Sequence, residues 1–246
     1  MSAVSPSAPA TASRGVQTLR FFQRFTRAQR WEHWLLFLSF TVLFLTGVVQ
    51  KYRTEAWSQQ ILSTPDRLEL VRNIHHAAAI VLTLQVLYHL GRATYLLSKR
   101  QMSPALFPTW QDVRDAGSMI KYLLFLTNKT PKFGKYNFEQ KFTYWFLFFG
   151  LGIMVVTGFV LWFPVQVTAV LPGGVVPAAK LAHSTEAIVA AIFVLIWHLY
   201  HVLVQRLNLS MFTGRLNEDD LRAYHAAEYE RLTGQSADEP GGGGQA

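Results

Sequence analysis

Four long stretches of this 246-residue chain contain no Asp, Glu, Lys or Arg, and they constrain its fold more than any other feature. They run from His33 to Gln50, Asn73 to Gly91, Phe142 to Ala179 and Ala187 to Gln205. Three of them are 18 to 19 residues long, close to the roughly 20 residues that cross a bilayer as a helix. The third is twice as long, and its Pro164 and Leu171-Pro-Gly-Gly174 predict a helix followed by a loop.

The expected fold is therefore all-α: an integral membrane bundle of four helices. The helices should cover about residues 31–51, 71–98, 139–163 and 179–207 within a domain of residues 21–207. Residues 1–20 and 208–246 are expected to be a disordered N-terminal tail and a cytoplasmic C-terminal tail, with a disordered Gly-rich end at 237–246. Between helices two and three, Thr109-Trp-Gln-Asp112 resembles a helix start and precedes spaced apolar residues. We expect an amphipathic cytoplasmic helix there, lying on the membrane or on a partner.

Composition supports the membrane interpretation and narrows the chemistry. Half of the residues are apolar and only 15% are charged, whereas soluble domains have about 25% charged residues. The net charge of +8 on a chain so poor in charge is not typical of a nucleic-acid binder. The chain has no cysteine, which excludes disulfides, thiolate zinc sites, cysteine-ligated iron–sulfur clusters and thioether-attached haem on this chain. Metal or redox chemistry would therefore depend on histidine.

The distribution of Lys and Arg predicts the orientation. The N-terminal tail, the segment from Arg92 to Lys141 and the C-terminal tail together carry 18 of the 23 basic residues. The other two loops carry the remaining five. Because basic loops stay on the cytoplasmic side, both termini should be cytoplasmic, in a bacterial inner membrane.

The first and third predicted helices are similar in sequence at an offset of 111 residues. Gln29-Arg-Trp-Glu-His-Trp34 followed by Thr46-Gly47 aligns with Gln140-Lys-Phe-Thr-Tyr-Trp145 followed by Thr157-Gly158. Helices two and four also correspond: Ile74-His75-His76-Ala77 resembles Ala182-His183-Ser184-Thr185, and Leu87-Tyr88-His89-Leu90 resembles Ile196-Trp197-His198-Leu199. Chance similarity between apolar helices is the alternative. A true repeat predicts two helical hairpins with approximate two-fold symmetry, and bundle interiors are common cofactor sites.

Seven of the eight histidines lie in or at the edges of the predicted spans: His33, His75, His76, His89, His183, His198 and His201. Polar side chains in hydrocarbon are costly and usually functional. On a regular helix, His75 and His89 are about 21 Å apart along the axis, and His183 is about 22 Å from His198 and about 27 Å from His201. Histidines therefore occupy two depths, where opposed imidazoles could ligate two or more haems b. A zinc or di-iron site would need carboxylates beside the histidines, and only Glu186 lies deep enough in a predicted span. A proton relay through His and Glu without haem is a further alternative.

The order and spacing of these motifs resemble the di-haem cytochrome b subunits of membrane-bound formate dehydrogenases, nickel–iron hydrogenases and thiosulfate reductases. The resemblance spans about residues 21–232 and rests on Arg30-Trp-Glu-His33-Trp34, Leu45-Thr-Gly47, Ile74-His75, Tyr88-His89-Leu90, Tyr144-Trp145, Thr157-Gly158, His183-Ser-Thr-Glu186-Ala187 and Trp197-His198-Leu-Tyr200-His201. It implies that His75, rather than His76, and His183 hold an outer haem, and that His33 and His198 hold an inner haem. The additional His89 and His201 leave the inner pairing open.

The internal repeat instead favours His89 with His198. In that case His33 and His201 would hold a third haem or line a quinone pocket. The resemblance implies an electron-transfer subunit that links the quinone pool to an iron–sulfur or multihaem cytochrome subunit on the outer side, where substrate catalysis takes place. A stand-alone quinone-linked oxidoreductase acting on superoxide or ferric iron, and a haem-free membrane anchor with a quinone site, remain alternative hypotheses.

Overall fold

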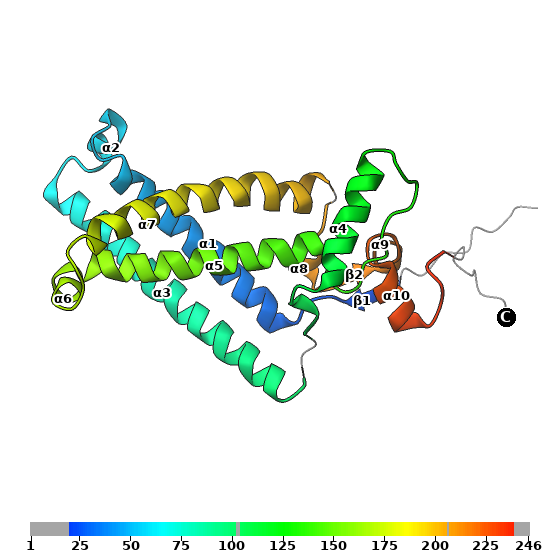
Figure 1. Ribbon diagram of the computed structural model, residues 1–246. Coiled ribbons are helices and arrows are strands. Elements are labelled where there is room, and N and C mark those ends of the chain that lie inside the picture. The colour runs from blue at the N-terminus through cyan, green and yellow to red at the C-terminus, as the bar shows by residue number, and fades with distance from the viewer. Residues whose placement is uncertain (1–19, 102–103, 206, 239–246) are drawn as a thin grey trace, which may run out of the picture.

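The computed structural model describes residues 20–101, 104–205 and 207–238. Within these ranges, four helices are long and apolar enough to cross a membrane (Figure 1). They are α1 (Arg27–Lys51), α3 (Pro65–Ser98), α5 (Phe138–Trp162) and a helix from Val175 to Val204 that begins as α7 (Val175–Ile192). The predicted all-α membrane fold is confirmed, and the last span begins a few residues before its predicted start.

The four spans form two helical hairpins. α1 packs along α3, α5 packs along α7, and α1 also contacts α7. The short helices α2 (Ala56–Ile61) and α6 (Pro164–Thr168) lie in the two hairpin turns, at the same end of the bundle (Figure 1). This is the arrangement that the internal repeat predicts, and it places α1 beside the helix that carries the last group of histidines.

The outer surface of the bundle is apolar. Leu38, Leu84, Phe149 and Leu195 each expose about 60% of their area, and many other large apolar side chains of the spans are exposed. A surface of this kind would be a large hydrophobic patch on a soluble monomer, whereas on a membrane protein it faces lipid. Together with the four apolar spans, it identifies the chain as an integral membrane protein.

The last span departs from α-helical geometry in its second half. After Ile192 it continues as two π-helical segments, η2 (Phe193–His198) and η3 (Tyr200–Val204). Such segments are rare and occur frequently at functional sites. A regular α-helix would place His198 about 60° beyond whole turns from His183. π-Helical hydrogen bonds join residues five positions apart, so each residue advances by a smaller angle around the axis than in an α-helix. This smaller angle rotates His198 back toward the face of His183.

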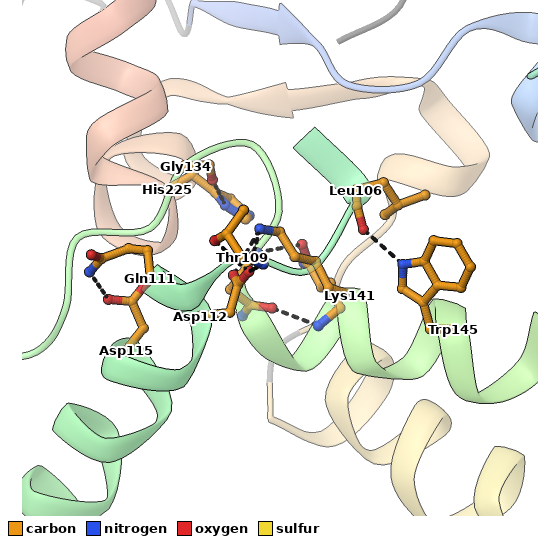
Figure 2. Close-up of polar contacts among 11 residues, drawn as sticks. Leu106, Thr109, Gln111, Asp112, Asp115, Gly134, Lys141, Trp145 and His225 are labelled. Atoms are coloured by element: carbon orange, nitrogen blue, oxygen red, sulfur yellow. Dashed lines mark hydrogen bonds and ion pairs between the residues drawn. The ribbon is translucent and has the colours of Figure 1, made fainter. Parts of the chain in front are cut away.

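A short helix, α4 (Trp110–Leu123), lies across the end of the bundle opposite the hairpin turns (Figure 1). Its first turn is fixed by Asp112, which accepts hydrogen bonds from the Thr109 amide and from the Lys141 ammonium group on α5, the latter at 2.8 Å (Figure 2). Just before it, the carbonyl of Leu106 in η1 (Pro104–Leu106) accepts a hydrogen bond from the Trp145 indole (Figure 2). The predicted amphipathic helix therefore exists and is attached to the start of α5.

Replacing Asp112 with asparagine should loosen α4. Burial by itself would raise the Asp112 pKa, but the Lys141 ammonium and Thr109 hydrogen bonds outweigh it and hold that pKa below its ordinary value of 3.8. The carboxylate therefore stabilises the fold above pH 3.8, and its contribution is lost as the pH falls through the lower folded-state pKa. We expect the free energy of local unfolding of α4 to fall by about 1–3 kcal/mol at neutral pH. The measurement is hydrogen exchange, in which the α4 amides should exchange faster.

Asp115→Asn is the matched control, because the hydrogen bond that the Asp115 carboxylate accepts from Gln111 on the same helix is exposed to solvent (Figure 2). This variant should leave exchange almost unchanged. Equal effects of the two substitutions would mean that the Asp112–Lys141 pair does not fix the helix.

The same end of the bundle carries a small folded unit, here named the cap. It combines β1 (Phe21–Gln23) and β2 (Arg215–Asn217), paired antiparallel, with the helices α8 (Ser210–Thr213), α9 (Glu218–Tyr224) and α10 (Ala226–Thr233). Leu216, Leu221 and Tyr229 form its buried core. The segment after residue 208, expected to be a tail, is thus folded as far as the structure describes it. The disorder predicted at 1–20 and 237–246 falls, except for Arg20, Ala237 and Asp238, outside the described residues.

The cap holds the start of α1. The Arg30 guanidinium donates hydrogen bonds to the carbonyl groups of Met211 and Phe212. The Trp34 ring packs against the Phe212 ring with centroids 4.6 Å apart. Because His33 lies between these two contacts, the cap fixes the helix turn that carries it.

Candidate functional site

Two pairs of histidines face each other inside the bundle. The ring of His75 on α3 lies 6.4 Å from that of His183 on α7, centroid to centroid. The ring of His33 on α1 lies 6.3 Å from that of His198 on η2. The two pairs lie at different depths, since 15 residues of the same helix separate His183 from His198. Four of the six predicted ligands are thus brought together, in two pairs of nearly equal separation.

Threonine hydroxyls orient the rings of the His75–His183 pair. The Thr46 oxygen lies 2.8 Å from Nδ1 of His75, and the Thr157 oxygen lies 3.0 Å from Nδ1 of His183. Each hydroxyl donates its own hydrogen to the carbonyl four residues earlier, at 2.7 Å for Thr46 and 2.6 Å for Thr157. The hydroxyl oxygens therefore accept the Nδ1 hydrogens, which leaves each Nε2 with a free lone pair. Hydrogen bonds of this kind orient metal-ligating histidines.

A glycine follows each of these threonines and lies against the same ring. A Cβ added at Gly47 would meet Cε1 of His75 at 3.4 Å, and one added at Gly158 would meet Cε1 of His183 at 3.2 Å. The small residues let each helix approach its imidazole closely. The Thr-Gly pairs that revealed the repeat therefore build the same surroundings for both members of this pair.

The His33–His198 pair lies near the cap end and has a different environment. Nδ1 of His33 is buried and has no hydrogen-bond partner among the residues that the structure describes. Buried polar atoms are normally paired, and each exception calls for an explanation. Because the His33 ring also faces a second imidazole, it is suited to binding a group between the two rings.

His89 is hydrogen-bonded to other side chains rather than paired with a second histidine. Its Nδ1 lies 2.6 Å from a carboxylate oxygen of Glu32, and its Nε2 lies 3.0 Å from the Tyr144 hydroxyl. The other Glu32 oxygen accepts a hydrogen bond from Arg92 at 3.0 Å. With both ring nitrogens hydrogen-bonded, His89 belongs to a polar cluster of Glu32, His89, Arg92 and Tyr144, named the Glu32 cluster below.

The remaining span histidines contact protein groups as well. Nδ1 of His201 donates to the carbonyl of Trp197 at 2.7 Å, and its Nε2 lies 3.7 Å from a Glu139 oxygen. The His76 ring is stacked on Trp162 with centroids 4.0 Å apart. Among the described residues, no three His, Asp or Glu side chains gather as a site for a single metal ion. Within residues 20–101, 104–205 and 207–238, only the two pairs above bring two imidazole rings into contact.

Sequence reasoning missed the roles of Thr46, Thr157, Glu32 and Tyr144. All four lie inside the motifs that define the repeat or the resemblance, but there they served only as landmarks. Polar residues at fixed positions in apolar helices were the signal that could have found them.

The model of the prokaryotic cytochrome b561 family matches residues 24–214 of the chain. The chain belongs to this family. It is 22% identical over 201 residues to the cytochrome b556(Fdn) subunit of the nitrate-inducible formate dehydrogenase of Escherichia coli, covering 81% of this chain and 86% of that one. It is 24% identical over 213 residues to the E. coli formate dehydrogenase cytochrome b556(fdo) subunit, covering 85% and 92%.

A third relative is the formate dehydrogenase cytochrome b556 subunit of Haemophilus influenzae, with 29% identity over 133 residues. That alignment covers 54% of this chain and 51% of the relative, so the chain spans about half the length of that subunit. Membership of the cytochrome b561 family makes the chain a membrane electron-transfer protein whose cofactor is haem b, which confirms the family predicted from the motifs.

The two histidine pairs fit haem b. Two metal–imidazole bonds of about 2 Å each, plus the distance from each nitrogen to its ring centre, add up to roughly 6 Å between ring centres. The observed separations of 6.3 and 6.4 Å therefore leave room for one iron between the rings of each pair. The threonine hydrogen bonds, which leave Nε2 of His75 and His183 free, agree with the same chemistry.

Gly158→Ala should weaken haem binding more than Gly47→Ala does. The new methyl group would lie 3.2 Å from the His183 ring, which is tighter than ordinary contact, whereas the 3.4 Å at Gly47 is acceptable. Displaced ligand orientation typically lowers metal affinity by about 10-fold to 100-fold. We expect that range of loss for Gly158→Ala, measured as haem retained per chain during dilution with a haem-binding competitor. The same loss in both variants would contradict a role of close packing at Gly158.

Proposed function

We propose that the chain is a membrane subunit that passes electrons between a partner redox subunit and the quinone pool through two haems b. The observation that carries the proposal is the presence of two imidazole pairs with nearly the same ring separation at two depths of one bundle. Each haem, when bound, would supply a reversible one-electron centre. Two such centres at different depths would give a route for electrons across the membrane.

The ligand assignment follows from how each imidazole is engaged. His75 and His183 would hold the haem near the hairpin turns, with Thr46 and Thr157 fixing their ring orientation. His33 and His198 would hold the haem near the cap. The alternative pairing of His89 with His198 is less favoured because both nitrogens of His89 are hydrogen-bonded to other side chains. A third haem is not proposed, because the His201 ring donates to its own helix.

The Glu32 cluster would serve quinone chemistry. Reduction or oxidation of a quinone moves protons together with electrons, so a site of this kind needs side chains that take up and release protons. Glu32 is adjacent in sequence to His33, and its carboxylate is linked through His89 to the Tyr144 hydroxyl. His89 would exchange a proton with quinone at this end of the bundle, while Arg92 holds the Glu32 carboxylate in place.

The location and the partner are inferred from charge and from the relatives. The basic residues favour both termini and the cap in the cytoplasm of a bacterial cell, with the membrane being the inner one. The His75–His183 pair would then lie toward the outer side. The curated relatives are subunits of formate dehydrogenases, which supports an iron–sulfur or multihaem redox subunit as the partner. Docking on the outer side would bring that partner near this pair.

A haem count together with a quinol assay tests the proposal. The purified chain should contain two haems b in a pyridine haemochrome assay, and a quinol should reduce both in the absence of a partner. Fewer than two haems per chain would overturn the electron-route proposal, and a colourless protein would support the haem-free anchor instead. Two haems that no quinol reduces would leave electron transfer intact but refute the quinone site.

A further inference from the structure

The helix α4 presents an apolar side that the rest of the described chain does not cover. Large exposed side chains on this helix and directly after it include Val113, Ile120, Leu123, Leu124 and Phe125. Phe125 exposes 94% of its area and lies within a run of exposed apolar residues, Leu123 to Leu126, at the exit of the helix. An apolar surface of this extent on a protein needs a specific covering.

The depth of α4 is set by its attachment to α5. Asp112 binds Lys141, and the uncharged part of that span begins at the next residue, Phe142. The Leu106 carbonyl binds Trp145, one helical turn further along the span. Indole groups gather where hydrocarbon meets headgroups. The segment that leads into α4, and its first turn, therefore lie at the boundary of the hydrocarbon.

The direction of the apolar side follows from the same contact. Because Asp112 points toward α5, residues four, eight and eleven positions later lie on roughly the same side of the helix. These residues are Ala116, Ile120 and Leu123, all of them apolar. Figure 1 shows α4 running across the bundle end at a steep angle to α5. The helix axis therefore runs along the membrane surface, and the side that carries Asp112 is turned toward the spans.

Charged residues complete the pattern of an interfacial helix. Arg114 and Lys121 lie on the side away from Asp112, and Lys129 follows the apolar exit. Interfacial helices combine an apolar face in the acyl boundary with basic residues near anionic headgroups.

We propose that α4 and the Leu123–Phe125 exit lie in the headgroup–acyl boundary of the bilayer at the cap end, and so bind lipid rather than a protein partner. The lipid-facing surface of the spans continues at this point into the apolar side of α4. This proposal depends on the membrane location of the chain and not on haem or quinone binding.

The absence of cysteine permits a direct test. Phe125→Cys and the matched control Gln111→Cys, which is exposed on the polar side of α4, would each carry a single spin label in the full-length chain. Both proteins would be placed in liposomes of phosphatidylethanolamine and phosphatidylglycerol. Accessibility to dissolved oxygen and to a water-soluble nickel chelate reports the depth of each label. Both sites are exposed, so neither substitution removes core packing.

The label at residue 125 should show a severalfold higher ratio of oxygen to nickel accessibility than the label at residue 111. Equal and high nickel accessibility at both sites in liposomes would overturn the proposal. If the label at residue 125 became protected from nickel only in the complex with its redox partner, the covering would be protein and the lipid assignment would be wrong.

Discussion

Replacing His183 with alanine is expected to remove one of the two haems and to leave the other. The His75–His183 pair would lose one of its two axial nitrogens, and Thr157 would lose the imidazole that it orients. The second pair lies on other residues at a different depth, so its haem should remain. The haem content should fall from about two to about one per chain, measured by pyridine haemochrome assay against protein mass.

His75→Ala should give the same result, since the two residues form one pair. His76→Ala is the matched control, because the His76 ring is stacked on Trp162 and not on another imidazole. It should retain both haems. In the His183 variant, the spectrum of the haem that remains bound serves as a control that the protein is folded. Retention of two haems in His75→Ala, or loss of one in His76→Ala, would refute the assignment of this pair.

The second prediction with a large effect distinguishes His33, as a haem ligand, from His89, as a proton-transfer group. His33→Ala should lose the haem near the cap, because it removes one of two facing rings that are 6.3 Å apart. His89→Ala should keep both haems but oxidise quinol more slowly. Loss of a positioned acid–base group commonly costs about 10²–10⁴-fold in rate, and we expect a decrease within that range. Haem content and stopped-flow reduction by quinol measure the two effects independently.

Tyr144→Phe provides a milder variant of the same cluster. It removes the hydroxyl that lies 3.0 Å from Nε2 of His89 and leaves Glu32 and Arg92 paired. Both haems should be retained, with a smaller decrease in rate than in His89→Ala. If His89→Ala lost a haem while His33→Ala retained two, the pairing of His89 with His198 predicted by the repeat would be correct.

The spans and their approximate ends followed from the sequence alone. A bilayer cannot satisfy exposed backbone groups or charges in its core, so long uncharged stretches have to become helices of about the observed length. The α4 helix was also predicted, because Thr109 and Asp112 form a start signal that depends only on neighbouring residues. The histidines could be placed at two depths because the rise of a helix is fixed.

The partner of each histidine could not be derived in this way. Helical spacing gives the depth and the face of His33 and His89, but the choice between them depends on how α1, α3 and the last span are rotated against one another. The π-helical turns around His198 change that rotation, and no local sequence pattern predicts them. Likewise, the cap forms because β1 and β2 are brought together from distant parts of the chain.

For this protein, then, the sequence by itself determined the membrane fold, the family and the set of histidines available for chemistry. These properties depend on hydropathy and on short motifs, which act locally. Only the tertiary structure brought His33 opposite His198, engaged His89 with Glu32 and Tyr144, and folded the cap against Arg30 and Trp34. These contacts join residues far apart in the chain, and their geometry is decided by side-chain packing between helices rather than by any one helix.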